Sequence, residues 1–206
     1  MASTETDLFI FVGHPRATSL SQALADAYEA GARAAGASVR RMDLNAMAFD
    51  PDLTEGYKAR KTLEPDLEAW REAVAGARKI ALFYPQWWGG MPAKMKGVFD
   101  RAYLPGFAMR YHEKGPFWDR LLTGRSAEVF LTADTPPWWD RFVYGRPAAR
   151  QVERLVLNFA GIKPVIIREF GPVKLASERK IAGWIKSAEA RGAAAGRRVC
   201  EGKSPK

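Results

Sequence analysis

The sequence predicts an α/β fold in which a parallel β-sheet is covered by helices on both faces. Two observations support this fold class. Short apolar segments alternate with longer, alanine-rich amphipathic segments along most of the chain. The apolar segments, such as 80–83 (IALF), show no polar alternation, which is typical of strands buried on both faces. Together they predict a doubly wound, five-stranded parallel sheet between two helical layers.

In the first half of the chain, turn residues separate each strand from the next helix. The first helix ends before Gly36, a residue typical of helix C-termini. Pro92 suits a first helical turn, where its missing N–H costs no hydrogen bond. The predicted elements are strand 7–12, helix 19–35, strand 38–43, helix 66–76, strand 79–84 and helix 92–103.

The second half repeats this alternation. Gly161 predicts the end of the helix that precedes the last strand. The predicted elements are strand 127–131, a loop, helix 147–159, strand 164–169 and helix 177–198.

Two insertions interrupt the pattern, at 49–64 and 104–124. The second contains FAMRY, expected as a hairpin arm, and PFWDRLL, expected as a helical turn. Long loops in compact domains are usually either functional or disordered, and the aromatic residues of the second insertion argue against disorder. We therefore expect both insertions to contribute to specificity.

Composition fits one domain over 1–206, with a basic tail from about residue 191. The chain is 47% hydrophobic and 27% charged, and no apolar run approaches the roughly 20 residues of a membrane span. The N-terminal segment MASTETD lacks the features of a signal peptide, so we expect a cytoplasmic protein without membrane insertion. One cysteine and two histidines argue against a structural metal site.

The formal net charge of +9 raises the question of nucleic-acid binding. Much of this charge lies on the last predicted helix and the tail, and no nucleic-acid-binding motif accompanies it. We therefore expect no nucleic-acid partner, and a basic surface would instead attract polyanionic nucleotides.

Two loops carry candidate chemistry. The first strand enters GHPRATSLSQAL, where helix N–H groups, hydroxyls, His14 and Arg16 could hold a phosphate; alternatively, Ser19 or Thr18 only caps the helix. The third strand enters YPQWWGGMP, a ledge of aromatics and glycines for a flat ligand, or simply a hydrophobic turn. Ligands of open parallel sheets bind beyond the carboxyl ends of strands, where both loops are expected.

With a third loop, VFLTADTPPWW, these motifs resemble the flavodoxin-like NAD(P)H quinone oxidoreductases, the DT-diaphorase-like flavoproteins, over about 8–190. The resemblance implies a flavodoxin-like three-layer sandwich with strand order 2-1-3-4-5. It also implies a flavin cofactor and NAD(P)H as co-substrate. The flavin phosphate would be held by the first loop, the isoalloxazine ring would be wrapped by the second, and the third would close its other side. The implied binding residues are His14, Arg16, Thr18, Ser19, Leu20, Ser21, Pro85, Gln86, Trp87, Trp88, Gly89, Thr132, Ala133, Asp134 and Thr135.

The third loop departs from the family pattern. Better-known relatives carry Thr-Thr-Gly-Gly followed by a tyrosine and a histidine that are proposed to assist hydride transfer, and this chain has no histidine there. Three alternatives remain for the proton-handling role of that histidine: Tyr144 fills it, water fills it, or the reaction does not need it. Asp134 is expected to shape the loop rather than to act as a base.

The resemblance implies two-electron transfer from NAD(P)H through the flavin to a quinone or similar small acceptor. The backbone N–H groups of Trp87, Trp88 and the Thr132 turn would stabilise negative charge on the reduced ring. Asp100 and Arg101 need no role beyond an exposed helical face. The alternative function is a flavin-binding electron carrier or a redox-sensing regulatory subunit, such as a transporter ancillary protein.

Two finer expectations concern the flavin and the assembly. The histidine-containing phosphate turn and the aromatic cover favour FAD over FMN, whereas the short chain favours FMN; an adenylate groove could use 49–64. In relatives, the region that matches 104–124 helps to cover the partner subunit's flavin. We therefore expect a homodimer, with Trp138, Trp139 and Phe142 as further interface candidates.

Overall fold

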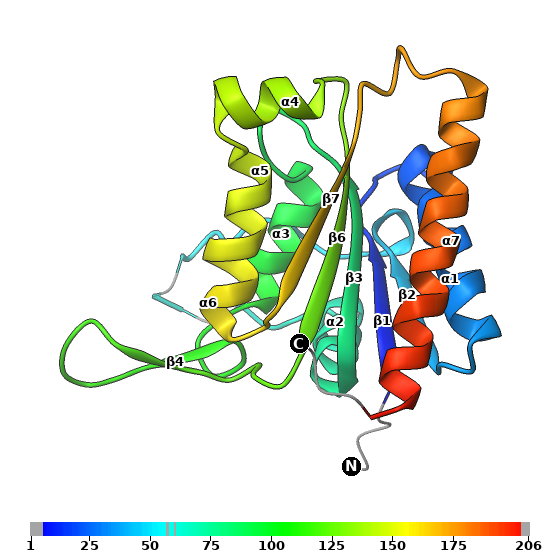
Figure 1. Ribbon diagram of the computed structural model, residues 1–206. Helices are drawn as coiled ribbons and strands as arrows, with labels where there is room; N and C mark the ends of the chain where they lie inside the picture. The colour runs from blue at the N-terminus through cyan, green and yellow to red at the C-terminus, as the bar shows by residue number, and fades with distance from the viewer. Residues whose placement is uncertain (1–5, 57, 60, 203–206) are drawn as a thin grey trace.

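The computed structural model describes residues 6–56, 58–59 and 61–202, which form a three-layer sandwich around one parallel sheet (Figure 1). The sheet order is β2-β1-β3-β6-β7, and every neighbouring pair is parallel. Counting only these strands, the order is the expected 2-1-3-4-5, so the predicted fold class is confirmed. The strands are β1 (Thr6–Val12), β2 (Val39–Asp43), β3 (Ala77–Pro85), β6 (Ser126–Thr132) and β7 (Val165–Phe170).

Helices cover both faces of the sheet (Figure 1). One face carries α1 (Leu20–Ala34) and α7 (Glu178–Cys200). The other face carries α2 (Pro65–Gly76), α3 (Ala93–Ala102) and a continuous helical segment of three parts. These parts are α5 (Pro147–Arg150), the π-helical η3 (Gln151–Leu157) and α6 (Asn158–Ala160).

The strands are apolar because successive side chains enter two different cores. In β1, Leu8 and Ile10 pack toward α1 and α7, whereas Phe9 and Phe11 pack toward α2. Phe11 meets the edge of Trp70, with 5.9 Å between ring centroids. A strand buried on both faces needs no polar side, which explains the unbroken apolar runs in the sequence.

The helices α1 and α7 approach each other closely because glycines line their contact. A Cβ atom added at Gly192 would lie 1.9 Å from the carbonyl oxygen of Tyr28, and one added at Gly31 would lie 2.1 Å from that of Glu189. Real Cβ atoms do not come this close to backbone, so the two helices could not keep this separation with larger residues. A Cβ atom added at Gly183, on the same helix as Gly192, would meet no neighbour within 4 Å.

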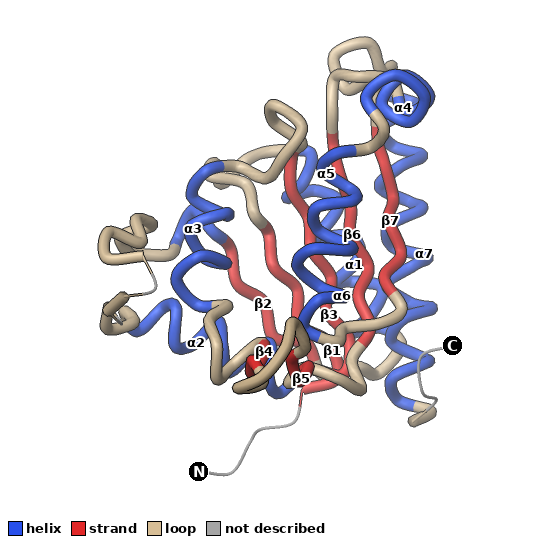
Figure 2. The backbone as a smooth tube through the Cα atoms, turned by 90° about the vertical axis from the view of Figure 1, so that its left-hand side faces the viewer, coloured by secondary structure: helices blue, strands red, loops and turns tan. Residues whose placement is uncertain are grey.

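The insertion 104–124 forms a hairpin, β4 (Met109–Tyr111) with β5 (Trp118–Arg120). The FAMRY arm is therefore found as expected, but the helical turn expected for PFWDRLL is wrong, because Trp118 pairs with Tyr111 in this hairpin. The Trp118 indole donates to the carbonyl of Phe159 (2.9 Å), which anchors the strand to α6. Figure 2 places the hairpin at the end of the sheet opposite α4. The hairpin therefore does not cover the loops at the carboxyl ends of the parallel strands in the same chain.

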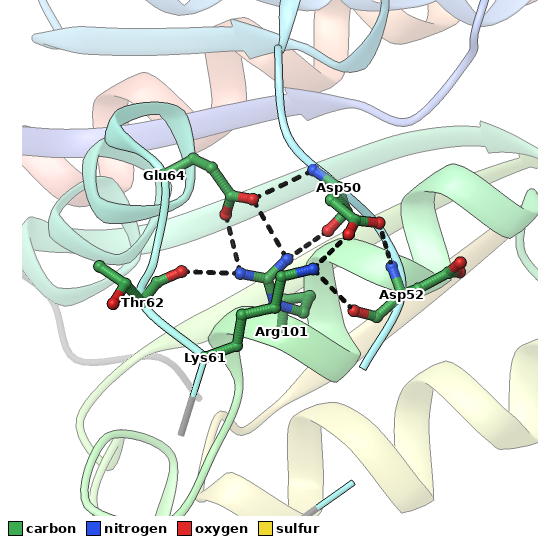
Figure 3. Close-up of polar contacts among 6 residues, drawn as sticks. All are labelled: Asp50, Asp52, Lys61, Thr62, Glu64 and Arg101. Atoms are coloured by element: carbon green, nitrogen blue, oxygen red, sulfur yellow. Dashed lines mark hydrogen bonds and ion pairs between the residues drawn. The ribbon is translucent and has the colours of Figure 1, made fainter. Parts of the chain in front are cut away.

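The insertion 49–64 is held against α3 by Arg101 (Figure 3). Arg101 is 1% exposed, so the expectation of an exposed helical face is wrong for this residue. Its guanidinium donates to Glu64 (2.8 Å), to the carbonyl of Thr62 (2.9 Å) and to the carbonyl of Asp50. Burying a guanidinium is costly unless acceptors compensate its charge, and the insertion supplies acceptors for both terminal nitrogens of Arg101.

The last expected features concern the region after β6 and the tail. The loop expected after β6 contains helical turns, α4 (Pro137–Trp139) and the π-helical η2 (Asp140–Tyr144); the remaining short element is the 3-10 turn η1 (Leu44–Ala46). The basic tail continues α7 to Cys200, and its final residues 203–206 lie outside the described residues. Within the described part of the chain, no helix combines the length and apolar character needed to cross a membrane.

The α1–α7 contact predicts opposite effects for two glycine-to-alanine substitutions on one helix. We expect Gly192→Ala to lower the free energy of unfolding by about 1–3 kcal/mol, because the added methyl overpacks the contact with Tyr28. Gly183→Ala should raise it by up to about 1 kcal/mol, because alanine is the better helix former and meets no neighbour. Urea unfolding of the two variants measures the difference, and equal effects would contradict a close-packing role for Gly192.

Candidate functional site

Three loops meet at the carboxyl ends of β1, β3 and β6, and hydrogen bonds join them. The Gly13 N–H donates to the carbonyl of Phe83 (2.8 Å), which ties the first loop to β3. The Gln86 N–H donates to the carbonyl of Thr132 (2.8 Å), which ties the second loop to the third. Ser21 and Thr132 share a hydroxyl hydrogen bond of 3.3 Å, which ties the third loop to α1. The structure therefore brings together three motifs that lie far apart in the sequence.

The first loop presents polar groups at the beginning of α1. Ser19 is the N-cap, and its Oγ accepts the N–H of Gln22 (3.1 Å). This confirms the capping alternative as a fact of the structure, but the N–H groups of Leu20 and Ser21 still lack an intrahelical acceptor, as in any first turn. Arg16 and Thr18 are exposed beside them. Capping and anion binding are thus compatible at this turn.

His14 lies beneath this turn and connects it to the second loop. It is 5% exposed, its Nδ1 accepts the backbone N–H of Arg16 (3.0 Å), and its ring meets the edge of Trp87 at 5.7 Å between centroids. Burial and the nearby Arg16 charge lower the pKa of His14, so its neutral form is favoured. An anion bound at the turn would oppose this shift.

The second loop is a tight turn that holds an indole in solvent. Trp87 and Gly90 exchange two backbone hydrogen bonds of 3.0 Å each. The central residues have positive φ, 51° at Trp88 and 73° at Gly89, as in a type I′ turn. Glycine adopts this conformation freely, but in tryptophan it is strained, and Trp88 is fully exposed. Backbone strain at a residue whose apolar side chain is exposed indicates a functional position.

The second loop also limits what its other residues can contribute. Pro85 is buried as the last residue of β3, so it can offer only its backbone. The N–H of Trp87 is used inside the turn, so it is not free to stabilise charge on a ligand, contrary to expectation. The N–H of Trp88 has no acceptor among the residues that the structure describes, and it remains available.

The third loop is held in shape by β7 and by the segment that follows it. The Ala133 N–H donates to the carbonyl of Phe170 (3.0 Å). Asp134 accepts the backbone N–H of Lys174 (3.0 Å), and the Lys174 ammonium lies 3.2 Å from its other oxygen. These contacts are the geometry expected of a residue that shapes the loop. Thr135 lines a small hollow between the third loop and the end of β7.

Tyr144 lies on η2, directly after the third loop, and is 59% exposed. Its ring neighbour is Trp139, at 6.4 Å between centroids. Nearby, Arg146 has a positive φ of 58° and pairs with Glu169 (2.9 Å). The structure thus leaves Tyr144 exposed, in ring contact with the end of the third loop.

Sequence reasoning missed Asp140, which lines the same hollow as Gln86 and Thr135. Asp140 is 4% exposed, and its Oδ1 accepts the side-chain amide of Gln86 (2.8 Å). The residues are 54 positions apart, and no local pattern marks the pair. The position of Asp140 directly after two tryptophans was the available signal, since a charged residue in an aromatic segment often has a specific partner.

Comparisons with known proteins agree with this fold. A family model described as flavodoxin-like fold matches residues 6–191. NAD(P)H dehydrogenase (quinone) 1 of Cavia porcellus is 29% identical over 149 residues, which cover 59% of this chain and 54% of that protein. The chain thus spans about half the length of this relative. An uncharacterized NAD(P)H oxidoreductase of Haemophilus influenzae is 27% identical, with 82% of this chain and 86% of that protein covered.

Solved structures show the same fold. The structure of the NAD(P)H:quinone oxidoreductase from Methanothermobacter marburgensis superposes with a TM-score of 0.75 at 25% identity. The alignment covers 92% of this chain and 98% of that one. Similarity therefore extends over nearly the whole chain.

The lowered pKa of His14 predicts a pH dependence of stability. The folded state binds a proton at His14 more weakly than the unfolded state does. The stability that the neutral His14 contributes is therefore present above about pH 6.5 and is lost as the pH falls through the folded-state pKa. In urea unfolding, the free energy of unfolding of the wild type should be lower at pH 5.5 than at pH 8. In His14→Asn this decrease should be smaller. His112→Asn controls for the loss of an imidazole, and an unchanged pH dependence in His14→Asn would contradict the assignment.

Proposed function

Since the chain belongs to the flavodoxin-like fold family, we propose that it is a flavin-dependent NAD(P)H oxidoreductase that reduces a quinone or a similar small acceptor. The observation that carries the proposal is the convergence of the three loops on one edge of the sheet, with Trp88 strained and exposed between them. The relatives named above, which are NAD(P)H oxidoreductases, support the same activity.

The residues present fit a flavin phosphate and a flavin ring. The first turn of α1 offers N–H groups of Leu20 and Ser21, the hydroxyl of Thr18 and the guanidinium of Arg16. The tight turn offers the faces of Trp87 and Trp88 for stacking. Both sets open on the carboxyl ends of adjacent strands, where this kind of sheet binds its ligands.

A bound flavin would supply the two-electron chemistry, by taking a hydride from NAD(P)H and passing it to the acceptor. The protein would orient the reacting ring through Trp87 and Trp88 and exclude water from one side of it. The free N–H of Trp88 would favour negative charge near the ring, as oriented backbone dipoles do. We propose Tyr144 as the group that holds or donates a proton, from its exposed position beside Trp139.

Three finer proposals accompany the activity. FAD is the favoured flavin, although the polar groups of 49–64 that could have met an adenylate are in part used by Arg101. A homodimer is proposed, and the expected interface residues Trp138, Trp139 and Phe142 are all exposed on the helical turns after β6. The protein is proposed to act in the cytoplasm.

The absorbance spectrum of the purified protein tests the activity. We expect a yellow protein whose flavin bands bleach when NADH or NADPH is added without oxygen, and chromatography of heat-released flavin identifies FAD or FMN. A colourless protein that takes up neither flavin would overturn the proposal. A bound flavin that neither nucleotide reduces would favour an electron carrier or a redox sensor instead.

Substitution of Trp88 separates ligand binding from folding. Trp88→Gly should weaken flavin binding about tenfold or more, because a stacking surface is lost. It should leave the free energy of unfolding of the flavin-free protein within about 1 kcal/mol of wild type, because the indole is exposed and glycine accepts a positive φ. Fluorescence titration and urea unfolding give the two values, and a large loss of stability with unchanged affinity would assign Trp88 to folding.

A further inference from the structure

A side-chain hydrogen bond joins Asp140, in the segment after β6, to Gln86 in the second loop. Gln86 Nε2 donates to Asp140 Oδ1 at 2.8 Å, and the Gln86 backbone is already held by the carbonyl of Thr132. An ionised carboxylate only accepts hydrogen bonds, so it selects the NH2 end of the glutamine amide. The carbonyl end, Oε1, is thereby directed away from Asp140.

The main chain holds Asp140 in place. Its N–H donates to the carbonyl of Pro136 (3.0 Å), and its own carbonyl accepts the N–H of Arg146 (2.9 Å). It begins the π-helical turn η2, an irregularity that is frequent at functional sites. The carboxylate is therefore a fixed acceptor rather than a mobile surface group.

The second carboxylate oxygen of Asp140 is buried and has no hydrogen-bond partner among the described residues. Among the residues that the structure describes, no ion pair joins Asp140 to a cation. The nearby Arg146 is paired with Glu169 instead. A buried acceptor without a donor costs stability, so its retention calls for an explanation. The hollow that Asp140 lines with Gln86 and Thr135 places this uncompensated charge at the edge of the candidate site.

We propose that Asp140 is a positioning residue for the flavin site: it fixes the Gln86 amide so that the carbonyl oxygen is offered to the ligand, and its charge disfavours the reduced flavin. This inference rests on the proposed function. A carbonyl acceptor at Gln86 would select a ligand edge that carries an N–H donor. A fixed negative charge beside the ring would lower its reduction potential, because reduction adds negative charge.

Two substitutions at Asp140 separate its geometry from its charge. Asp140→Asn keeps an acceptor for Gln86, so affinity for oxidised FMN or FAD should stay within about threefold of wild type. Loss of the charge should raise the two-electron midpoint potential by about 30 mV, which corresponds to tenfold tighter relative binding of the reduced flavin. Asp140→Ala removes the acceptor and should weaken binding of the oxidised flavin about tenfold.

A double-mutant cycle tests whether Asp140 acts through Gln86. Asp140→Ala should cause no further loss of flavin affinity in a Gln86→Ala background, because the contact is already absent. Flavin affinity is measured by fluorescence titration, the potential by equilibration with a reference dye, and folding by thermal unfolding of the flavin-free variants. If Asp140→Ala fails to fold, the potential of Asp140→Asn still decides.

The outcomes are distinguishable. Coupled losses together with a raised potential in Asp140→Asn support the proposal. Additive losses, or an unchanged potential in Asp140→Asn, overturn it while leaving the proposed function intact. A wild-type protein that binds neither FMN nor FAD overturns the proposed function, and this inference with it.

Discussion

The parallel register of β1, β3 and β6 is the constraint on which the candidate site depends. Each strand ends at the same edge, and hydrogen bonds continue the pairing past the strand ends, from Gly13 to Phe83 and from Gln86 to Thr132. Loops that share backbone hydrogen bonds cannot move independently. The polar turn at α1, the indole turn and the third loop therefore act as one rigid surface, and preorganisation of this kind is what a tightly bound cofactor requires.

The elements of the central sheet were predictable because their signals are local. The apolar runs and the capping residues Ser19 and Ser177 place strands and helices to within about two residues of the observed bounds. The first two loops were also readable, since position after a buried strand and residue type together indicate a ligand edge. These features depend on neighbours in the sequence, so the sequence displays them.

Features that depend on distant partners were not predictable. Arg101 looks like a surface helix residue, and only the insertion 49–64 makes it buried. PFWDRLL has helical character by itself, but pairing of Trp118 with Tyr111 makes it a strand. Asp140 gains its importance from Gln86, 54 residues earlier. In each case, tertiary contacts override the local preference.

The glycine-lined contact of α1 with α7 has a consequence for synthesis on the ribosome. The side of α1 that carries Gly31 and the carbonyl of Tyr28 is covered only when residues 178–200 have packed against it. During translation, α1 and the first three strands of the sheet emerge well before α7, because β3 ends at Pro85 and α7 begins at Glu178. That apolar face must stay exposed, or be shielded by a chaperone, until α7 has left the exit tunnel.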